Sequence, residues 1–145
     1  MKIQIQKLDP NATLPTFGSE QAAGADLYAL LDAPLSIAPG QTVLIKTGVA
    51  MAIPDGYVGL IFARSGLASK RGLAPANKVG VIDSDYRGEL MVALHNHSAQ
   101  PQTVEPKERI AQLAILPYLH PTFEVAESLD ETKRGVGGFG STGTK

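Results

Sequence analysis

Residues 39–63 read PGQTVLIKTGVAMAIPDGYVGLIFA, and this stretch decides the fold class. Pro39-Gly40 and Pro54-Asp55-Gly56 are strong turn signals. Short apolar runs follow each turn, and we predict strands over 42–46, 49–53 and 57–63. Because turns rather than long helices separate these runs, the pattern favours an all-β sandwich or barrel.

The rest of the chain repeats this rhythm, with 15 glycines and 10 prolines spread along 145 residues. One short helix is predicted over 64–71, with Ser65 near its start and Gly72 as its stop. The polar segment 120–133 is expected to run over the surface. Further strands are predicted over 2–6, 25–30, 79–83, 89–95 and 109–116.

Composition excludes several classes of function. Hydrophobic residues make up 43% and charged residues 19%, which suits one soluble domain with its own core. The net charge of -1 argues against a nucleic-acid partner, and the lack of cysteine excludes disulfides and thiol chemistry. No apolar run is long enough to span a membrane, so we expect a cytoplasmic protein. His95, His97 and His120 make a poor zinc signal.

The segment Arg134 to Gly143 (RGVGGFGSTG) is rich in glycine. Its backbone N–H groups and hydroxyls can bind phosphate oxygens, Arg134 can hold a phosphate bidentately, and Phe139 offers a ring face. It is not a Walker A loop, because Ser141 stands where that loop needs lysine. A closing flap over a ligand and a disordered tail both remain open.

A second dense segment is GVIDSDYRGEL at 80–90, which we interpret as a β-hairpin. A calcium loop starting at Asp83 would need glutamate where Leu94 stands, so that interpretation fails. Asp83 either caps local N–H groups in a turn or serves as a base on water at a pocket floor, with Tyr86 as a flat wall beside it.

Three further positions are candidates. Arg64-Ser65-Gly66 follows an apolar strand and can present backbone N–H groups to an anion, although Ser65 could be a plain N-cap. Asp26, among small apolar residues, is expected to be half-buried and paired with an arginine, for which Arg64 is a candidate. Gln112 is expected to share a strand face with Ile110 and Ala114 and to bond either a backbone group of another chain or a ligand oxygen.

Taken in order, five segments resemble the five motifs of the trimeric deoxyuridine triphosphate nucleotidohydrolases (dUTPases). The resemblance implies a jelly-roll-like homotrimer whose three active sites each draw on all three chains. It implies hydrolysis of dUTP to dUMP and pyrophosphate, with supply of dUMP for thymidylate synthesis. The segments are AGADLYA (23–29), ARSGLA (63–68), GVIDSDYRGE (80–89), RIAQLAI (109–115) and RGVGGFGSTG (134–143).

The resemblance also assigns roles to residues. Asp83 would be the general base, Tyr86 would pack under the deoxyribose, and Mg²⁺ would be held by phosphates and water rather than by protein ligands. Residues 1–133 would form the jelly-roll domain, and 134–145 a flexible arm that closes over a neighbour's site. Uracil would be recognised by Asn77, Gly80 and Val81, with Met91 as an apolar contact beneath the base. The phosphates would be bound by Arg64, Ser65, Gly66 and Gln112, with Asp26 supporting the arginine. The residues that close over the site would be Arg134, Phe139, Gly140, Ser141 and Thr142.

Two other functions stay open at this point. A dCTP deaminase has a similar fold, but its family uses a glutamate beside the base, where this chain has Asp83 and Tyr86. The other is a non-catalytic β-sandwich interaction module with a disordered tail. In that case, adding nucleotide would not protect the amides of the tail from hydrogen exchange.

Overall fold

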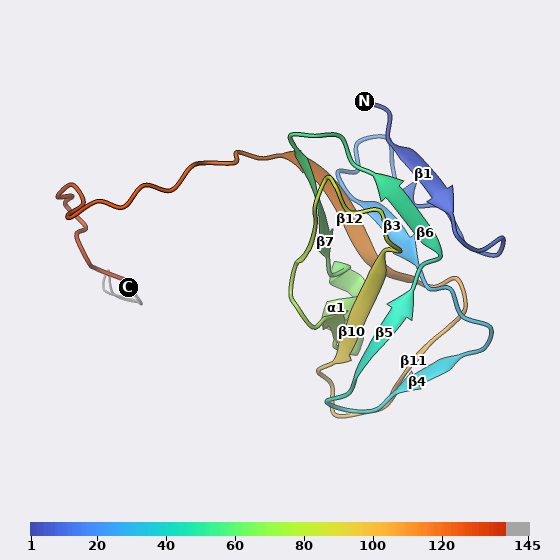
Figure 1. Ribbon diagram of the computed structural model, residues 1–145. Coiled ribbons are helices and arrows are strands. Elements are labelled where there is room, and N and C mark those ends of the chain that lie inside the picture. Colours follow the sequence, from blue (N-terminus) through green and yellow to red (C-terminus); the bar gives the residue numbers. More distant parts are fainter. Residues whose placement is uncertain (139–145) are drawn as a thin grey trace.

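The computed structural model describes residues 1–138 and shows a mostly β protein with a single short helix (Figure 1). Each of the predicted strands is present, with ends shifted by a few residues. Sequence reading missed β2, β4, β8 and β11, because runs of two or three residues are too short to show alternation. The elements are β1 (Gln4–Lys7), β2 (Thr16–Phe17), β3 (Ala25–Tyr28), β4 (Leu35–Ile37), β5 (Thr42–Lys46), β6 (Val49–Ala52), β7 (Tyr57–Phe62), α1 (Ser65–Arg71), β8 (Leu73–Pro75), β9 (Gly80–Ile82), β10 (Met91–Asn96), β11 (Gln102–Val104) and β12 (Arg109–Pro117).

The two turn signals form as predicted. Gln41 N–H donates to Ala38 O at 3.0 Å, with Gly40 at φ 74°. Tyr57 N–H donates to Pro54 O at 3.2 Å, and Gly56 lies at φ 79°. Positive φ at the third turn position is what a type II turn requires, and glycine adopts it without strain.

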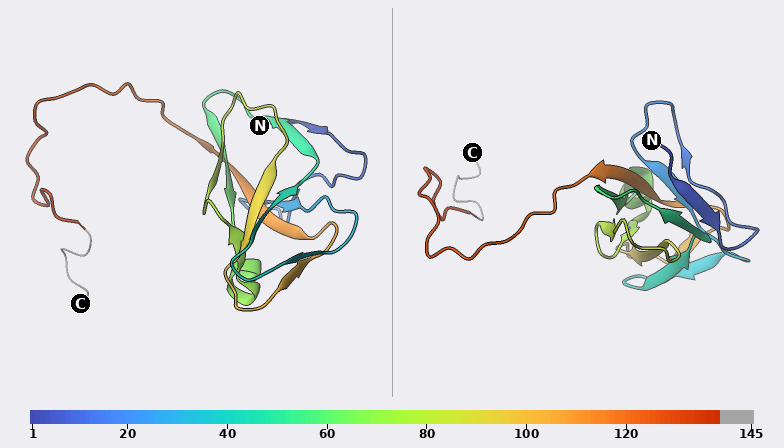
Figure 2. Two further views of the ribbon diagram at one scale, coloured as in Figure 1. Left: turned by 60° about the horizontal axis from the view of Figure 1, so that its bottom comes forward. Right: turned by 45° about the horizontal axis from the view of Figure 1, so that its top comes forward.

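The strands form separate sheets rather than a closed barrel, so the barrel form of the prediction is wrong (Figures 1 and 2). The largest sheet has the order β2-β3-β12-β7-β9, and a second has the order β5-β10-β8. Two-stranded pairs, β1-β6 and β4-β11, complete the body. Every pairing is antiparallel.

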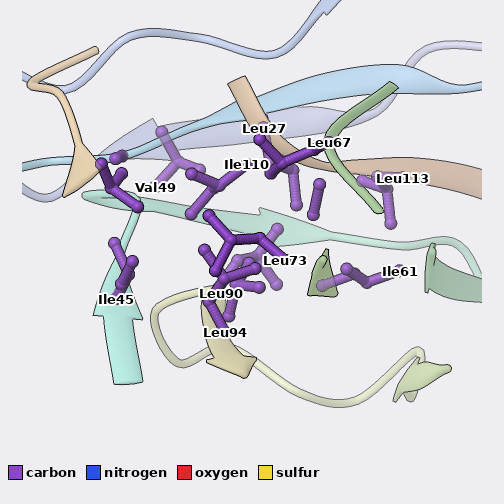
Figure 3. Packing of buried hydrophobic residues seen from close by; sticks show 14 of the residues in the cluster. Leu27, Ile45, Val49, Ile61, Leu67, Leu73, Leu90, Leu94, Ile110 and Leu113 are labelled. Atoms are coloured by element: carbon purple, nitrogen blue, oxygen red, sulfur yellow. The ribbon is translucent and has the colours of Figure 1, made fainter. Parts of the chain in front are cut away.

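Alternating side chains from these sheets meet in one hydrophobic core (Figure 3). On β10, for example, Val92 and Leu94 are buried while Met91 is exposed. Burying a side chain such as Leu94 contributes about 2 kcal/mol. Other core members are Leu27, Ile45, Val49, Ile61, Leu67, Leu73, Leu90, Ile110 and Leu113.

A β-bulge in β12 overturns one prediction. The register with β3 shifts between Arg109 and Ala111, and Ile110 is fully buried. Gln112 pairs with Asp26 and Phe62 on the other side of the sheet, which we call the outer face. Ile110 therefore does not share a face with Gln112, because the inserted residue breaks the two-residue alternation.

The segment 80–90 is not a hairpin. β9 pairs with β7, whereas β10 pairs with β5 and β8 in a different sheet. The intervening residues 83–90 form a loop that joins the two sheets. The sequence pattern predicts a hairpin because the two apolar runs are neighbours along the chain. It carries no information on the strands with which each run pairs in the folded protein.

The helix ends as predicted but begins differently. Gly72 caps its C-terminus at φ 66°, which confirms the predicted stop. Its N-cap is Arg64, with no side-chain capping bond, so Ser65 is the first helical residue rather than the cap.

Residues 118–138, here called the C-terminal segment, leave the end of β12 and extend away from the body (Figures 1 and 2). Residues 120–133 therefore form an exposed arm that leads to the glycine-rich residues, as predicted, but the arm extends away from the body instead of lying on its surface. Large apolar side chains along the segment are almost fully exposed, including Phe123 at 93% and Val125 at 100%. Within residues 1–138, no helix has the length and apolar character needed to cross a membrane.

Candidate active site

One group of candidate residues lies on the outer face where β7 ends. Arg64 Nε donates to Asp26 Oδ1 at 2.7 Å, which confirms the predicted pairing. Arg109 Nη1 donates to the other oxygen of the same carboxylate, Oδ2, at 3.2 Å. The Asp26 side chain is only 12% exposed, so the carboxylate orients both guanidinium groups in a partly dehydrated setting. Two cations sharing one anion leave a net positive charge for an anionic ligand.

Gln112 belongs to the same group. Its Nε2 donates to Ala63 O at 2.9 Å, a backbone group of its own chain rather than of another chain. A Cβ built on Gly24 would lie 2.8 Å from Gln112 Oε1, so glycine at position 24 leaves room for the amide. The side chain is therefore held beside Arg64, at the start of α1.

Asp83 lies in the loop after β9. Tyr86 N–H donates to the backbone oxygen of Asp83 at 3.2 Å, and Arg87 Nη1 donates to Ser84 O at 2.6 Å. Within residues 1–138 no hydrogen bond or ion pair uses the carboxylates of Asp83 or Asp85, so these side chains do not cap the turn. The exposed Asp83 carboxylate is available to a ligand or to water.

Three pockets lie around this loop, and the largest, of about 690 Å³, has both Asp83 and Asp85 in its lining. The two smaller pockets adjoin one another. Asp83, Tyr86 and Met91 line one of about 240 Å³, and Asn77, Gly80 and Met91 line another of about 110 Å³. Val81, Ile82 and Met91 contribute to both of these pockets, so the two spaces adjoin. The smaller suits a flat ring, since buried Gly80 and the apolar side chain of Ile61 line it closely.

A tight turn forms the rim of the smaller pocket. Lys78 N–H donates to Pro75 O at 3.0 Å, and Val79 N–H donates to Asn77 O at 2.7 Å. Lys78 adopts φ 65°, a left-handed conformation that lysine rarely takes. Non-glycine residues held in this region cluster at functional sites, where the strain serves to fix geometry.

The two groups are well separated within one chain. Strand order places Asp26 on β3 three strands from β9, which is roughly 14 Å at about 4.8 Å per step. The groups also differ in position along β7. Asp26 aligns through Gln112 with Phe62 at the end of that strand, whereas Ile82, just before Asp83, aligns with Gly59. One subunit therefore brings Arg64, Gln112 and Asp26 together, and Asp83, Tyr86 and Met91 together, but does not join the two groups.

The predicted closing residues fall in a third place. Arg134 lies on the C-terminal segment, where its Nε donates to Gly137 O at 2.8 Å. Phe139, Gly140, Ser141 and Thr142 lie outside the described residues.

Two of the three histidines lie close together. His95 and His97 share a face, with ring centroids 4.3 Å apart, and Thr42 Oγ1 lies 2.8 Å from His95 Nδ1. The pKa of His97 is lowered from its ordinary value, first by desolvation and then by His95 and Lys78. Within residues 1–138, no three His, Cys, Asp or Glu side chains gather as metal ligands would.

Arg109 was not among the predicted site residues, although it is the first residue of the segment RIAQLAI (109–115). The bulge at Ile110 puts Arg109 on the same outer face as Gln112, at the level of Tyr28. Without the bulge, alternation would place Arg109 and Gln112 on opposite faces. Only knowledge of the strand register could have found it.

These features define a β protein with a cationic cluster suited to an anion and a separate, carboxylate-bearing pocket suited to a flat ring. The family model described as dUTPase matches residues 10–143, and the chain belongs to this dUTPase family. It is an enzyme of that family.

Full-length relatives agree. A deoxyuridine 5'-triphosphate nucleotidohydrolase of Desulfitobacterium hafniense is 54% identical over 144 residues, covering 99% of this chain and 95% of its own. One from Paraburkholderia phymatum is 48% identical over 146 residues, covering 99% of both chains.

Solved structures show the same fold. The dUTPase of Staphylococcus bacteriophage 80alpha with dUPNHPP gives a TM-score of 0.89 at 30% identity, covering 98% of each chain. A mutant dUTPase from phage phi11 of S. aureus, whose structure reveals the coordination of a structural Mg(II) ion, gives 0.78 at 27% identity, covering 88% of this chain and 98% of its own.

Proposed function

We propose that this protein hydrolyses dUTP to dUMP and pyrophosphate, and so lowers dUTP while supplying dUMP for thymidylate synthesis. The observation that carries the proposal is the free Asp83 carboxylate on a pocket that adjoins the ring-sized space of Asn77 and Gly80. A base bound in the smaller pocket would place its sugar against Tyr86 and its first phosphate near Asp83.

Each residue near Asp83 has a specific task in this reaction. Asp83 orients and deprotonates the water that attacks the α-phosphorus. Tyr86 packs under the deoxyribose and leaves no room for a 2′-hydroxyl. Asn77, with backbone groups of Gly80 and Val81, reads the polar edge of uracil, and Met91 supports the base from below.

The cationic group binds the leaving phosphates. Negative charge grows on the departing pyrophosphate as the bond to the α-phosphorus breaks, and Arg64 and Gln112 stabilise that charge together with N–H groups at Ser65 and Gly66. Asp26 holds Arg64 in place through the 2.7 Å bond.

Magnesium fits this site only through the substrate. Within residues 1–138 there is no cluster of carboxylates to cage the ion, whereas Mg²⁺ is commonly held by phosphate oxygens and water. Bound there, it would supply charge neutralisation at the triphosphate. The protein's own contribution is then to hold the triphosphate with Arg64 and Gln112.

A homotrimer with arm exchange is part of this proposal, and the separation of the two groups supports it. In one chain Asp83 follows Ile82, which lies opposite Gly59, whereas Arg64 follows the other end of β7, so a neighbouring chain would supply one of the two. The outer face offers an uncovered apolar area for such contact, since Val81 is 61% and Leu116 39% exposed. Exposed Phe123 and Val125 on the C-terminal segment likewise suit burial against another subunit.

Residues 134–145 serve as the closing arm, distinct from the domain of residues 1–133. Ordering a glycine-rich arm costs roughly 1–2 kcal/mol per residue, which only several charge-assisted contacts would offset. Arg134 and the hydroxyls of Ser141 and Thr142 provide such contacts at the γ-phosphate. Phe139, which Gly140 follows in the chain, stacks on uracil.

A nucleotide panel tests the activity. We expect release of pyrophosphate and dUMP from dUTP in the presence of Mg²⁺, with dTTP, dCTP and UTP at least about 100-fold poorer in kcat/KM. The pocket is shaped for uracil and deoxyribose, so the methyl group of thymine and the 2′-hydroxyl of ribose would each clash with its lining. Identifying the products is essential, because release of ammonia from dCTP would identify a deaminase instead and refute the proposal.

Mixing two inactive variants tests the shared site. Asp83→Asn and Arg64→Ala should each be inactive alone, but subunit exchange at equal amounts should restore about a quarter of wild-type activity, because random assembly leaves some sites with both groups intact. A mixture of Asp83→Asn with Tyr86→Ala is the control and should show no more activity than the two variants give when measured separately, since both lesions fall in one group. Failure of the first mixture would show that one chain supplies Asp83 and Arg64 together.

A further inference from the structure

We propose that Gly88 is a positioning residue that fixes the ring of Tyr86 and thereby sets the preference for deoxyribose over ribose. The inference rests on the proposed function, which puts Tyr86 beneath the sugar. A Cβ built on Gly88 would lie 2.4 Å from Tyr86 Oη, 2.5 Å from Cζ and 2.9 Å from Cε2. All three atoms belong to one side chain, so the ring lies directly over the α-carbon of Gly88.

The backbone at Gly88 does not itself require glycine. Gly48 and Gly72 adopt left-handed conformations at φ 71° and 66°, whereas Gly88 has no such positive φ. An alanine at position 88 therefore meets no conformational penalty of its own. Its only conflict is with the side chain of Tyr86.

The backbone beneath the ring is anchored, so it cannot yield to the added methyl group. Glu89 Oε1 accepts the N–H of Gly48 at 2.8 Å, and the Thr47 hydroxyl donates to Leu90 O at 2.6 Å. Leu90 N–H in turn donates to Val49 O at 2.8 Å. Residues 89 and 90 are thereby fixed to the turn between β5 and β6.

The ring itself is the part that can move. Tyr86 is 41% exposed, and its only side-chain hydrogen bond within residues 1–138 is the one from Oη to Glu89 O, at 3.0 Å. A methyl group at position 88 must displace the Tyr86 ring from its position over Gly88 and break the hydrogen bond to Glu89 O. The ring then no longer forms a close wall under the sugar, and the exclusion of a 2′-hydroxyl is lost.

The test compares Gly88→Ala with wild type on dUTP and UTP. We expect the ratio of kcat/KM for dUTP over UTP to fall roughly tenfold or more, mainly because UTP is no longer excluded, with little change in the melting temperature. Gly18→Ala is the matched control and should leave the ratio unchanged. A Cβ added to Gly18 would meet no atom within 4 Å, and the backbone there has no positive φ.

A double mutant separates positioning from a merely structural effect. In a Tyr86→Ala background, Gly88→Ala should have no further effect on the ratio, since it acts only through the ring. If Tyr86→Ala lowers the ratio and Gly88→Ala does not, this inference is overturned while the proposed function stands. If Tyr86→Ala leaves the ratio unchanged, the role of Tyr86 in the proposed function is itself wrong.

Should Gly88→Ala fail to fold, Tyr86→Phe provides the second measurement. It keeps the ring and removes only the bond to Glu89 O, so the ratio should fall by a smaller factor than in Tyr86→Ala. A wild-type ratio in Tyr86→Phe would count against positioning of the ring.

Discussion

Replacing Asp83 with asparagine is expected to lower kcat for dUTP by about 10²–10⁴-fold while nucleotide affinity changes little. Asparagine has nearly the same shape but cannot accept the proton of the attacking water. The carboxylate makes no hydrogen bond within residues 1–138, so its loss should not disturb the loop. Steady-state kinetics give kcat, and calorimetry with a non-hydrolysable dUTP analogue gives Kd.

Asp85→Asn is the matched control for this variant. Asp85 carries the same charge two residues away, yet it does not line the pocket shared by Asp83, Tyr86 and Met91. Its substitution should leave kcat near the wild-type value. Normal turnover in Asp83→Asn would remove this residue as the base, and an equal loss in both variants would point to general electrostatics instead.

Truncation after Lys133 is expected to leave a folded trimer with turnover reduced by roughly 10²-fold or more. Within residues 1–138 every strand and the whole core lie before residue 118, so the body is complete without the C-terminal segment. What the truncation removes is the proposed closure, in which Arg134 holds the terminal phosphate and Phe139 covers the base. Sedimentation reports the assembly, and kcat reports the chemistry.

Deletion of Thr144 and Lys145 alone is the control, since it keeps every residue assigned to closure. It should retain activity. Hydrogen exchange provides an independent readout: the amides of 137–143 should be protected by the dUTP analogue in the full chain. A fully active truncation, or unprotected amides at saturating analogue, would refute the catalytic role of the arm.

Several features of the site could be predicted because they depend on nearby residues. The motif carrying Asp83 and Tyr86 could be identified without coordinates, and so could the pairing of Asp26 with Arg64. An acidic side chain among small apolar residues needs a cationic partner if it is buried, whatever the fold around it. What remained ambiguous was whether Asp83 capped its own turn, which depends on where its carboxylate points.

Other features needed the three-dimensional arrangement. Arg109 joins Asp26 only because a bulge at Ile110 shifts the register of β12. The close approach of Tyr86 to Gly88, likewise, arises because residues 89 and 90 are tied to the turn between β5 and β6.

By itself, the sequence determined the β class of this protein, its turns at Gly40 and Gly56, the end of its helix at Gly72 and the identity of its candidate reactive groups. These follow from backbone preferences and side-chain chemistry that act over a few neighbouring residues. The tertiary structure alone decided that β9 pairs with β7 rather than with β10, and so that Asp83 and Arg64 lie apart within one subunit. Strand partners are chosen by burial across the whole core, which no local pattern encodes.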